Sequence, residues 1–198
     1  MEQKKGILVV SFGTSHLDTL ERTITAVEQY IAAQFPEYRV YRAFTSGMIL
    51  RKLKRKENLT FDNVEEALER MAADGIETAV IQPTHVINGI ENDRMLEAAE
   101  AYRDRFETMQ IGAPLLSTAE DYKKAVHAVM AEVDPAEDET LILMGHGTDH
   151  HANSAYPTLE YTFHLLGTVR YLWEPWRDFR ICRMCRRSWR SRDVKKSF

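Results

Sequence analysis

The chain has 198 residues, of which 44% are hydrophobic, and a formal net charge of −4. This is the composition of a soluble globular protein that can bury a substantial core. Its first apolar stretch, residues 7–12, is too short for a signal-peptide core or a membrane span, so we expect a cytoplasmic protein without membrane partners.

Apolar runs of strand length alternate with helical periodicity through most of the chain. Strands are predicted at residues 6–12, 39–44, 78–82 and 108–112 and in a run from Leu141 to His146. Helices are predicted at residues 20–31, 48–56, 61–73, 92–106 and 120–133, and Asp62 is a plausible N-cap of the third. This order predicts an α/β fold, with a doubly wound, mainly parallel sheet over residues 1–150. Residues 151–167 are predicted to begin a linker helix to a second domain.

Polar residues follow three of the predicted strands, where ligands of parallel sheets usually bind. They are Thr14, Ser15 and His16 after the first strand, His85, Asn88 and Glu91 after the third, and His146 and His150 after the last. We expect them to converge on one edge of one sheet. Imidazole binds divalent metals and accepts protons near neutral pH, and a nearby carboxylate can relay protons. The set therefore suits a site that removes protons while holding a metal.

Each candidate also has a purely structural interpretation. His146 could cap its strand, His85 could be a hydrogen-bonded loop histidine, and Glu91 could be a first-turn carboxylate favoured by the helix dipole. The glycine-rich and Walker-type nucleotide motifs are absent, so no nucleotide cofactor is predicted. Cys182 and Cys185 have CxxC spacing, but no second cysteine pair completes a zinc site.

Five stretches occur in an order that is more specific than any one of them. They are LVVSFGTS from Leu8, RAFTSGMI from Arg42 with RKL from Arg51, HVING from His85 with Glu91, PLLS from Pro114, and MGHG from Met144 with His150 and His151. Together they resemble the class II chelatases, most closely the anaerobic sirohydrochlorin cobaltochelatases. The resemblance implies ATP-independent insertion of Co²⁺, the substrate metal, into a tetrapyrrole in cobalamin biosynthesis. It also implies two similar α/β halves with the active site in the cleft between them.

The resemblance also implies roles for individual residues. His146 matches the histidine that binds the metal and accepts pyrrole protons, and Glu91 matches an acidic residue that handles protons. We expect Thr14, Ser15, His85 and Asn88 to contact the tetrapyrrole. The basic residues after Arg51 could attract its carboxylates or form a solvated helix face.

Residues 168–198 differ in composition from the rest of the chain. They hold eight Arg and two Lys against three acidic residues, a net charge of +7, which leaves −11 for residues 1–167. The resemblance fades after Leu166, at the same place. A shifted reading frame would explain both changes, and a basic arm that binds nucleic acid or membrane is the alternative. We expect a poorly packed, non-native tail and no nucleic-acid partner, because the main domain is acidic.

The family's second half should supply another metal-binding glutamate and a facing histidine, and neither is recognisable here. We therefore expect this chain to be weakly active or inactive as a chelatase. Two copies could rebuild a two-walled site as a homo-oligomer. The alternative function is a non-catalytic module that binds a tetrapyrrole or a metal.

Overall fold

The computed structural model describes residues 4–134, 141–167 and 171–175. The chain forms two compact units, Met1–Ser117 and Thr118–Phe198. Their division falls inside residues 1–150, the stretch predicted to form one domain, and the domain boundary near residue 150 stays a prediction.

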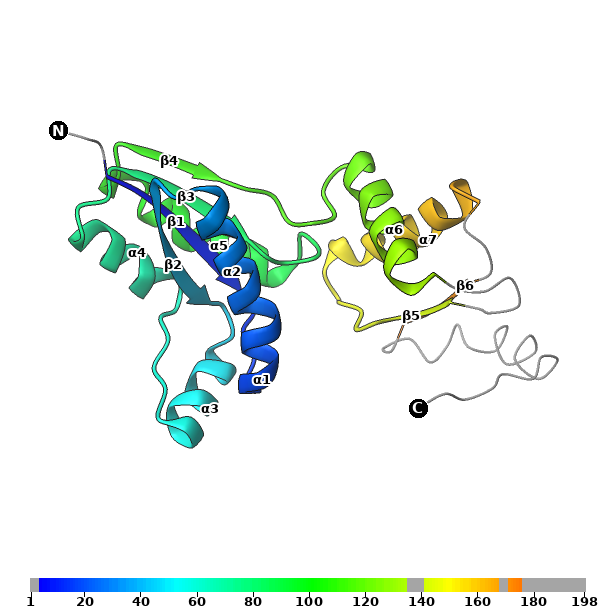
Figure 1. The fold of residues 1–198 in the computed structure, drawn as a ribbon, viewed down its shortest axis with the longest axis horizontal. Coiled ribbons are helices and arrows are strands. Elements are labelled where there is room, and N and C mark those ends of the chain that lie inside the picture. Colours follow the sequence, from blue (N-terminus) through cyan, green and yellow to red (C-terminus); the bar gives the residue numbers. More distant parts are fainter. Residues whose placement is uncertain (1–3, 135–140, 168–170, 176–198) are drawn as a thin grey trace. The chain divides into compact units, whose positions relative to one another are not determined.

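A four-stranded parallel sheet forms the centre of the first unit (Figure 1). Its order is β2 (Tyr38–Phe44), β1 (Lys5–Ser11), β3 (Thr78–Pro83) and β4 (Thr108–Ile111). Strand β1 is buried from Gly6 to Ser11, because it has a neighbour on each side and helices on both faces. Since all the pairs are parallel, the carboxyl ends of the four strands share one edge.

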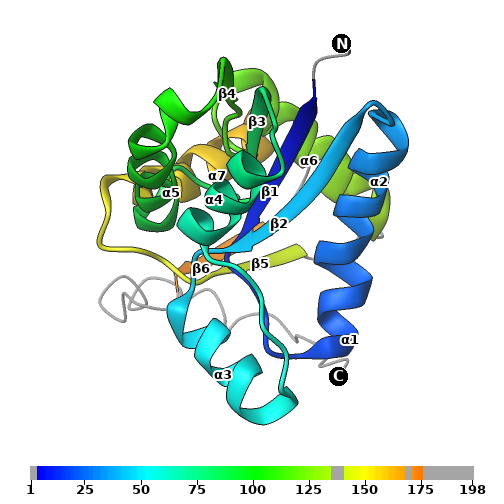
Figure 2. The same ribbon diagram turned by 90° about the vertical axis from the view of Figure 1, so that its left-hand side faces the viewer.

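Helices cover both faces of this sheet (Figure 2). On one face lie α4 (Val64–Ala73) and α5 (Ile90–Ala101), the latter followed by the 3₁₀ turn η2 (Arg103–Arg105). The segment α1 (Leu17–Leu20), π-helical η1 (Glu21–Thr25) and α2 (Ala26–Gln34) lies on the other. Helix α3 (Gly47–Glu57) follows β2. This arrangement confirms the predicted α/β fold with a parallel sheet.

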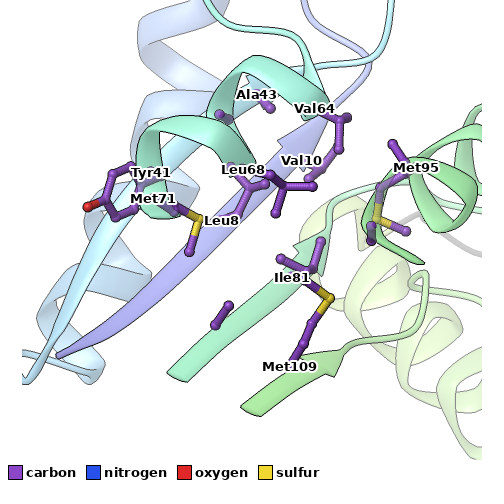
Figure 3. Close-up of a cluster of buried hydrophobic side chains, with 14 of the residues drawn as sticks. Leu8, Val10, Tyr41, Ala43, Val64, Leu68, Met71, Ile81, Met95 and Met109 are labelled. Atoms are coloured by element: carbon purple, nitrogen blue, oxygen red, sulfur yellow. The ribbon is translucent and has the colours of Figure 1, made fainter. Parts of the chain in front are cut away.

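The main core lies between the sheet and helices α4 and α5 (Figure 3). Leu8 and Val10 of β1 and Ile81 of β3 pack against Leu68 and Met71 of α4, and all five are buried. Burial of one such side chain stabilises the folded state by about 1.5–3 kcal/mol. Because several of them pack between the sheet and α4, this layer holds the strands, and with them the carboxyl edge of the sheet, in place.

The predicted cap of α4 is wrong by one residue. The Asn63 side chain accepts a hydrogen bond from the Glu66 N–H at 2.8 Å, and the Glu66 carboxylate accepts one from the Asn63 N–H at 2.9 Å. This reciprocal capping box makes Asn63 the N-cap. Asp62 instead pairs with Arg70 at 2.8 Å.

The second unit contains a parallel pair of strands and two longer helices. Its elements are α6 (Ala119–Val133), β5 (Leu141–Gly145), η3 (His151–Ser154), α7 (Ala155–Leu165) and β6 (Tyr171–Pro175). Val126 of α6 and Phe163 of α7 are buried at its core and contact the partly buried Leu141 and Leu143 of β5. Helix α6 begins with a capping box between Thr118 and Asp121.

One expectation about the strands is wrong. Strand β5 pairs with β6 and is not part of the four-stranded sheet, so the strand before His146 belongs to a different sheet from the one that precedes His85. Within the tail that was expected to be poorly packed, Tyr171–Pro175 is strand β6. Residues 168–170 and 176–198, with both cysteines, lie outside the described residues, so the predictions for them stay predictions.

A half-buried ion pair joins α2 to β2. Arg42 Nε donates to the two Glu28 carboxylate oxygens at 2.8 and 2.9 Å, and its Nη2 donates to Thr25 Oγ1 at 2.9 Å. The side chains are 24% and 10% exposed, so removing the negative charge leaves a poorly solvated guanidinium.

We expect Glu28→Gln to lower the free energy of unfolding by about 2 kcal/mol, somewhat less than for a fully buried pair. The matched control is Glu100→Gln in the exposed Glu100–Arg103 pair, which should leave stability unchanged. Urea denaturation followed by circular dichroism measures both. Equal effects of the two substitutions would show that burial of the Arg42–Glu28 pair is unimportant.

Candidate active site

Hydrogen bonds join the loops at the carboxyl edge of the four-stranded sheet. The Val10 carbonyl accepts the Thr84 N–H at 2.8 Å, and the hydroxyls of Ser11 and Thr84 lie 2.8 Å apart. The Ser11 carbonyl accepts the Thr45 N–H at 2.9 Å. The connections after β2 and β3 are therefore both held against the end of β1, which gives the site a fixed frame.

Thr14 and Ser15 lie half-buried in the loop between β1 and α1. The loop turns at Gly13, whose φ of 92° is one that residues with a side chain rarely adopt. The Thr14 hydroxyl accepts the His16 N–H at 3.2 Å, which fixes the turn into α1. Both predicted substrate contacts thus lie at the sheet edge.

His85 lies in the loop after β3, and its backbone is anchored to the loop after β4. The His85 carbonyl accepts the Leu115 N–H at 3.0 Å, and the Val86 carbonyl accepts the Leu116 N–H at 2.9 Å. Both ring nitrogens of His85 are buried, and neither hydrogen-bonds to a described residue. Burial lowers the pKa of His85, and the charge of Glu91 partly opposes this effect. The alternative interpretation of His85 was a loop histidine whose ring is hydrogen-bonded. The structure does not support it, because neither ring nitrogen has a hydrogen-bond partner among the described residues.

Glu91 lies in the first turn of α5. Its Oε1 accepts a hydrogen bond from Arg94 Nη1 at 3.0 Å, whereas Oε2 is buried and has no hydrogen-bond partner among the described residues. One oxygen is thus held by Arg94, and the other is buried without a hydrogen-bond partner in the described residues.

Asn88 is hydrogen-bonded to Asn92, a buried residue that was not among the predicted site residues. Asn92 is 2% exposed, and its Nδ2 donates to Asn88 Oδ1 at 2.6 Å. The signal in the sequence was the spacing of four residues, which places two side chains on the same side of a helix turn. Arg94, the partner of Glu91, was missed although its spacing of three residues gives the same signal.

Of the six residues with a predicted role, five therefore lie in loops or at a helix start at one edge of the first unit. His146 lies in the second unit, directly after β5, so the expected convergence on one sheet edge does not extend to it. Its side chain is exposed, and Nδ1 lies 3.1 Å from the carbonyl of Gly147, whose φ is 70°. The ring of His150 accepts the Ala152 N–H at 3.2 Å and so caps η3.

Helix α3 places a basic face after β2. Arg51, Lys54 and Arg55 are exposed, and within the described residues no salt bridge engages them. In the same residues, no three His, Cys, Asp or Glu side chains gather closely enough to hold a metal ion. None of the described helices is both long and apolar enough to cross a membrane.

Comparison with known proteins identifies the family. Residues 5–168 match the model of the cobalt chelatase (CbiK) family. The chain belongs to this cobalt chelatase family. It is 40% identical over 169 residues to the sirohydrochlorin cobaltochelatase of Salmonella typhimurium, a match that covers 85% of this chain and 63% of that protein.

A second relative is the sirohydrochlorin cobaltochelatase CbiKC of Nitratidesulfovibrio vulgaris, 34% identical over 160 residues, or 79% of this chain and 56% of that protein. The chain thus spans less than two thirds of the length of either relative. The resemblance to the sirohydrochlorin cobaltochelatases is confirmed.

Proposed function

We propose that this cobalt chelatase inserts Co²⁺, without ATP, into a tetrapyrrole of the sirohydrochlorin type in the cytoplasm. The observation that carries the proposal is the carboxylate of Glu91, which is oriented by Arg94 and keeps one buried oxygen without a hydrogen bond. Metal insertion displaces two pyrrole protons, and a positioned carboxylate is a suitable acceptor. The names of the two relatives support the metal and the substrate.

His146 is the proposed ligand of the incoming Co²⁺. The carbonyl of Gly147 can only accept a hydrogen bond, so the contact at 3.1 Å places the proton on Nδ1. Nε2 then carries the lone pair, and neutral imidazole nitrogen is a good ligand for divalent transition metals. A backbone carbonyl on the other ring nitrogen is the usual way in which proteins fix this tautomer.

The edge of the first unit also offers groups that suit a large, carboxylated macrocycle. Exposed apolar side chains occur in each of the four connections at this edge: Phe12 after β1, Met48 after β2, Val86 and Ile90 after β3, and Leu115 after β4. Thr14, Ser15 and Asn88 add polar groups, and α3 adds cations. We propose that these side chains contact the tetrapyrrole ring and its carboxylates.

If the cations of α3 attract the substrate, the double substitution Arg51→Ala/Lys54→Ala should weaken tetrapyrrole binding about 3- to 10-fold at low salt and have less effect at 0.5 M salt. Quenching of the fluorescence of the tetrapyrrole measures the dissociation constant. The matched control is Lys124→Ala on α6, which should leave binding unchanged. A salt-independent loss of affinity in the α3 variant would contradict an electrostatic role.

The proposed function is tested by a single-turnover assay. The purified chain is mixed in excess with the metal-free tetrapyrrole, Co²⁺ is added without ATP, and the absorbance of the metallated product is followed. Excess protein makes even weak activity measurable, so the assay also tests the expectation that the chain is weakly active or inactive. Insertion faster than in buffer supports the proposal, whereas binding without faster insertion supports the non-catalytic module.

A further inference from the structure

An open groove lies beside the helical segment α1–η1–α2 of the first unit. Its volume is about 550 Å³, which is within the range of sites for small organic ligands. Arg22 and Ile24 of η1, Val27 and Tyr30 of α2, and Thr84 after β3 are among the residues that line it. These residues all belong to the first unit, so the groove is a feature of that unit alone.

The groove lies on the face of the sheet opposite α4 and α5 (Figure 2), where β3 is incompletely covered. The residues of β3 that face α4 are buried, whereas Val80 and Gln82, on the other face, are partly exposed. Arg42 of β2 binds Glu28 and Thr25, which fixes the helical segment beside β2. Since β1 separates β2 from β3, space remains beside the helix on the β3 side.

The helical segment presents apolar side chains to this space instead of burying them. Val27 is 44% exposed and Tyr30 is 67% exposed, whereas the buried residue of α2 is Glu28. Arg22 and Ile24 belong to the π-helical turn η1, a rare conformation that is frequent at functional sites. Exposed apolar groups that line a groove of this size indicate a binding surface.

Arg22 gives the groove a cation. Its side chain is exposed, and no salt bridge engages it within the described residues. The Thr84 hydroxyl, in contrast, is engaged by the Ser11 hydroxyl at 2.8 Å and the Val10 carbonyl at 3.3 Å. A guanidinium can bind a carboxylate through two parallel hydrogen bonds. The groove therefore suits a ligand with an apolar body and a carboxylate.

Thr84 joins the groove to the candidate active site. It directly precedes His85, and its N–H is bonded to the Val10 carbonyl at 2.8 Å, so this end of the groove lies at the carboxyl edge of the sheet. A tetrapyrrole of the sirohydrochlorin type has a conjugated, apolar ring with carboxylate side chains all around its rim. When such a ring binds at the sheet edge, one side of the rim can extend into the groove.

We propose that the groove is a substrate subsite in which Arg22 binds a carboxylate on the rim of the tetrapyrrole, while Val27 and Tyr30 contact the adjoining part of the ring. This inference rests on the proposed function. It makes Arg22 a specificity-determining residue that favours tetrapyrroles with carboxylates all around the ring.

The first experiment locates the ligand by NMR. Metal-free sirohydrochlorin is added under anaerobic conditions to the 198-residue chain with labelled valine methyl groups. The ring current of the macrocycle should shift the Val27 methyl resonances. Those of Val64, which is buried in the core on the other face of the sheet, should not move. Unshifted Val27 methyl resonances at saturating sirohydrochlorin would overturn the subsite.

The second experiment measures the dissociation constant of sirohydrochlorin by fluorescence quenching. Arg22→Gln should weaken binding about 3- to 10-fold at low salt and less at 0.5 M salt. The matched control, Arg105→Gln, removes the same charge from η2 on the opposite face and should leave binding unchanged. Equal dissociation constants for these two variants would overturn the role of Arg22.

The apolar part of the subsite is tested by Val27→Ser/Tyr30→Ser. This double substitution should weaken binding to a similar extent at both salt concentrations, because salt does not screen apolar contacts. Both residues are exposed, so the circular dichroism spectrum should not change. Unchanged affinity in this variant would contradict the proposed contact with the ring.

The outcomes separate the subsite from the proposed function. Insertion of Co²⁺ by a chain whose Val27 resonances do not respond to sirohydrochlorin would overturn the subsite while the proposed function stands. Shifted Val27 resonances and weaker binding by Arg22→Gln, in a chain that inserts no Co²⁺, would refute the proposed function and leave the groove as a tetrapyrrole site. A chain that does not bind sirohydrochlorin would refute both.

Discussion

Replacing Glu91 with Gln is expected to lower the single-turnover rate of Co²⁺ insertion roughly 100-fold or more, the usual contribution of a positioned proton acceptor. The amide has nearly the shape of the carboxylate but cannot take a pyrrole proton. Because the contact with Arg94 can pass to the amide oxygen, the fold and tetrapyrrole binding should be preserved. The assay is the rate of metallation at saturating tetrapyrrole.

The matched control for Glu91→Gln is Glu97→Gln. Glu97 lies on the same helix, α5, and is exposed, so its neutralisation changes the net charge by the same amount. It should leave insertion unchanged. Equal rates for the two variants would show that Glu91 is not the proton acceptor.

Substitution of Gly13 by alanine should destabilise the first unit by about 2–4 kcal/mol, the sum of an unfavourable backbone conformation and a steric clash. The φ of 92° disfavours any residue with a side chain, and an added Cβ would lie 2.8 Å from the ring of Phe44. Phe44 is fully buried, so the ring has little room to move. Chemical denaturation followed by circular dichroism measures the change.

The control for Gly13→Ala is Gly47→Ala at the start of α3. Its nearest neighbour, 3.4 Å from the new Cβ, is the mobile end of Arg51, and its φ is not positive. Alanine should be neutral or slightly stabilising there, because it favours helix. Similar destabilisation by both substitutions would mean that the loop after β1 tolerates a side chain.

The sheet of the first unit could be predicted because its strands have strong local signals. The uninterrupted apolar run of β1 reflects burial on both faces, and each strand is followed by a polar turn and a helix. The cap of α4 was missed because Asp62 and Asn63 are both good capping residues. Only the reciprocal spacing from Asn63 to Glu66 distinguishes them.

The partner of β5 could not be predicted in the same way. Strand pairing joins segments distant in sequence, and Tyr171–Pro175 is a short run in a stretch dominated by positive charge. The prediction that the strand before His146 joins the other strands therefore failed, although the bounds of β5 agree closely with the predicted run.

For the candidate site, the residues that follow the strands could be predicted from the sequence, but the contacts of their side chains could not. Glu91 and His85 were found because polar residues after buried strands are conspicuous. Their unpartnered atoms depend on side-chain conformations that no local pattern encodes. The Arg94 contact and the Asn88–Asn92 bond join residues three and four positions apart, a spacing that permits these contacts but does not specify them.

We propose above that this cobalt chelatase uses His146 as a metal ligand in Co²⁺ insertion. The most direct measurement is the single-turnover rate of metallation by the purified 198-residue chain and by its His146→Ala variant, without ATP. We predict a rate above that in buffer that rises with protein concentration in the wild type, and a fall to the buffer rate in the variant with the circular dichroism spectrum unchanged. A wild-type rate equal to that in buffer, or an undiminished rate in His146→Ala, would contradict the account.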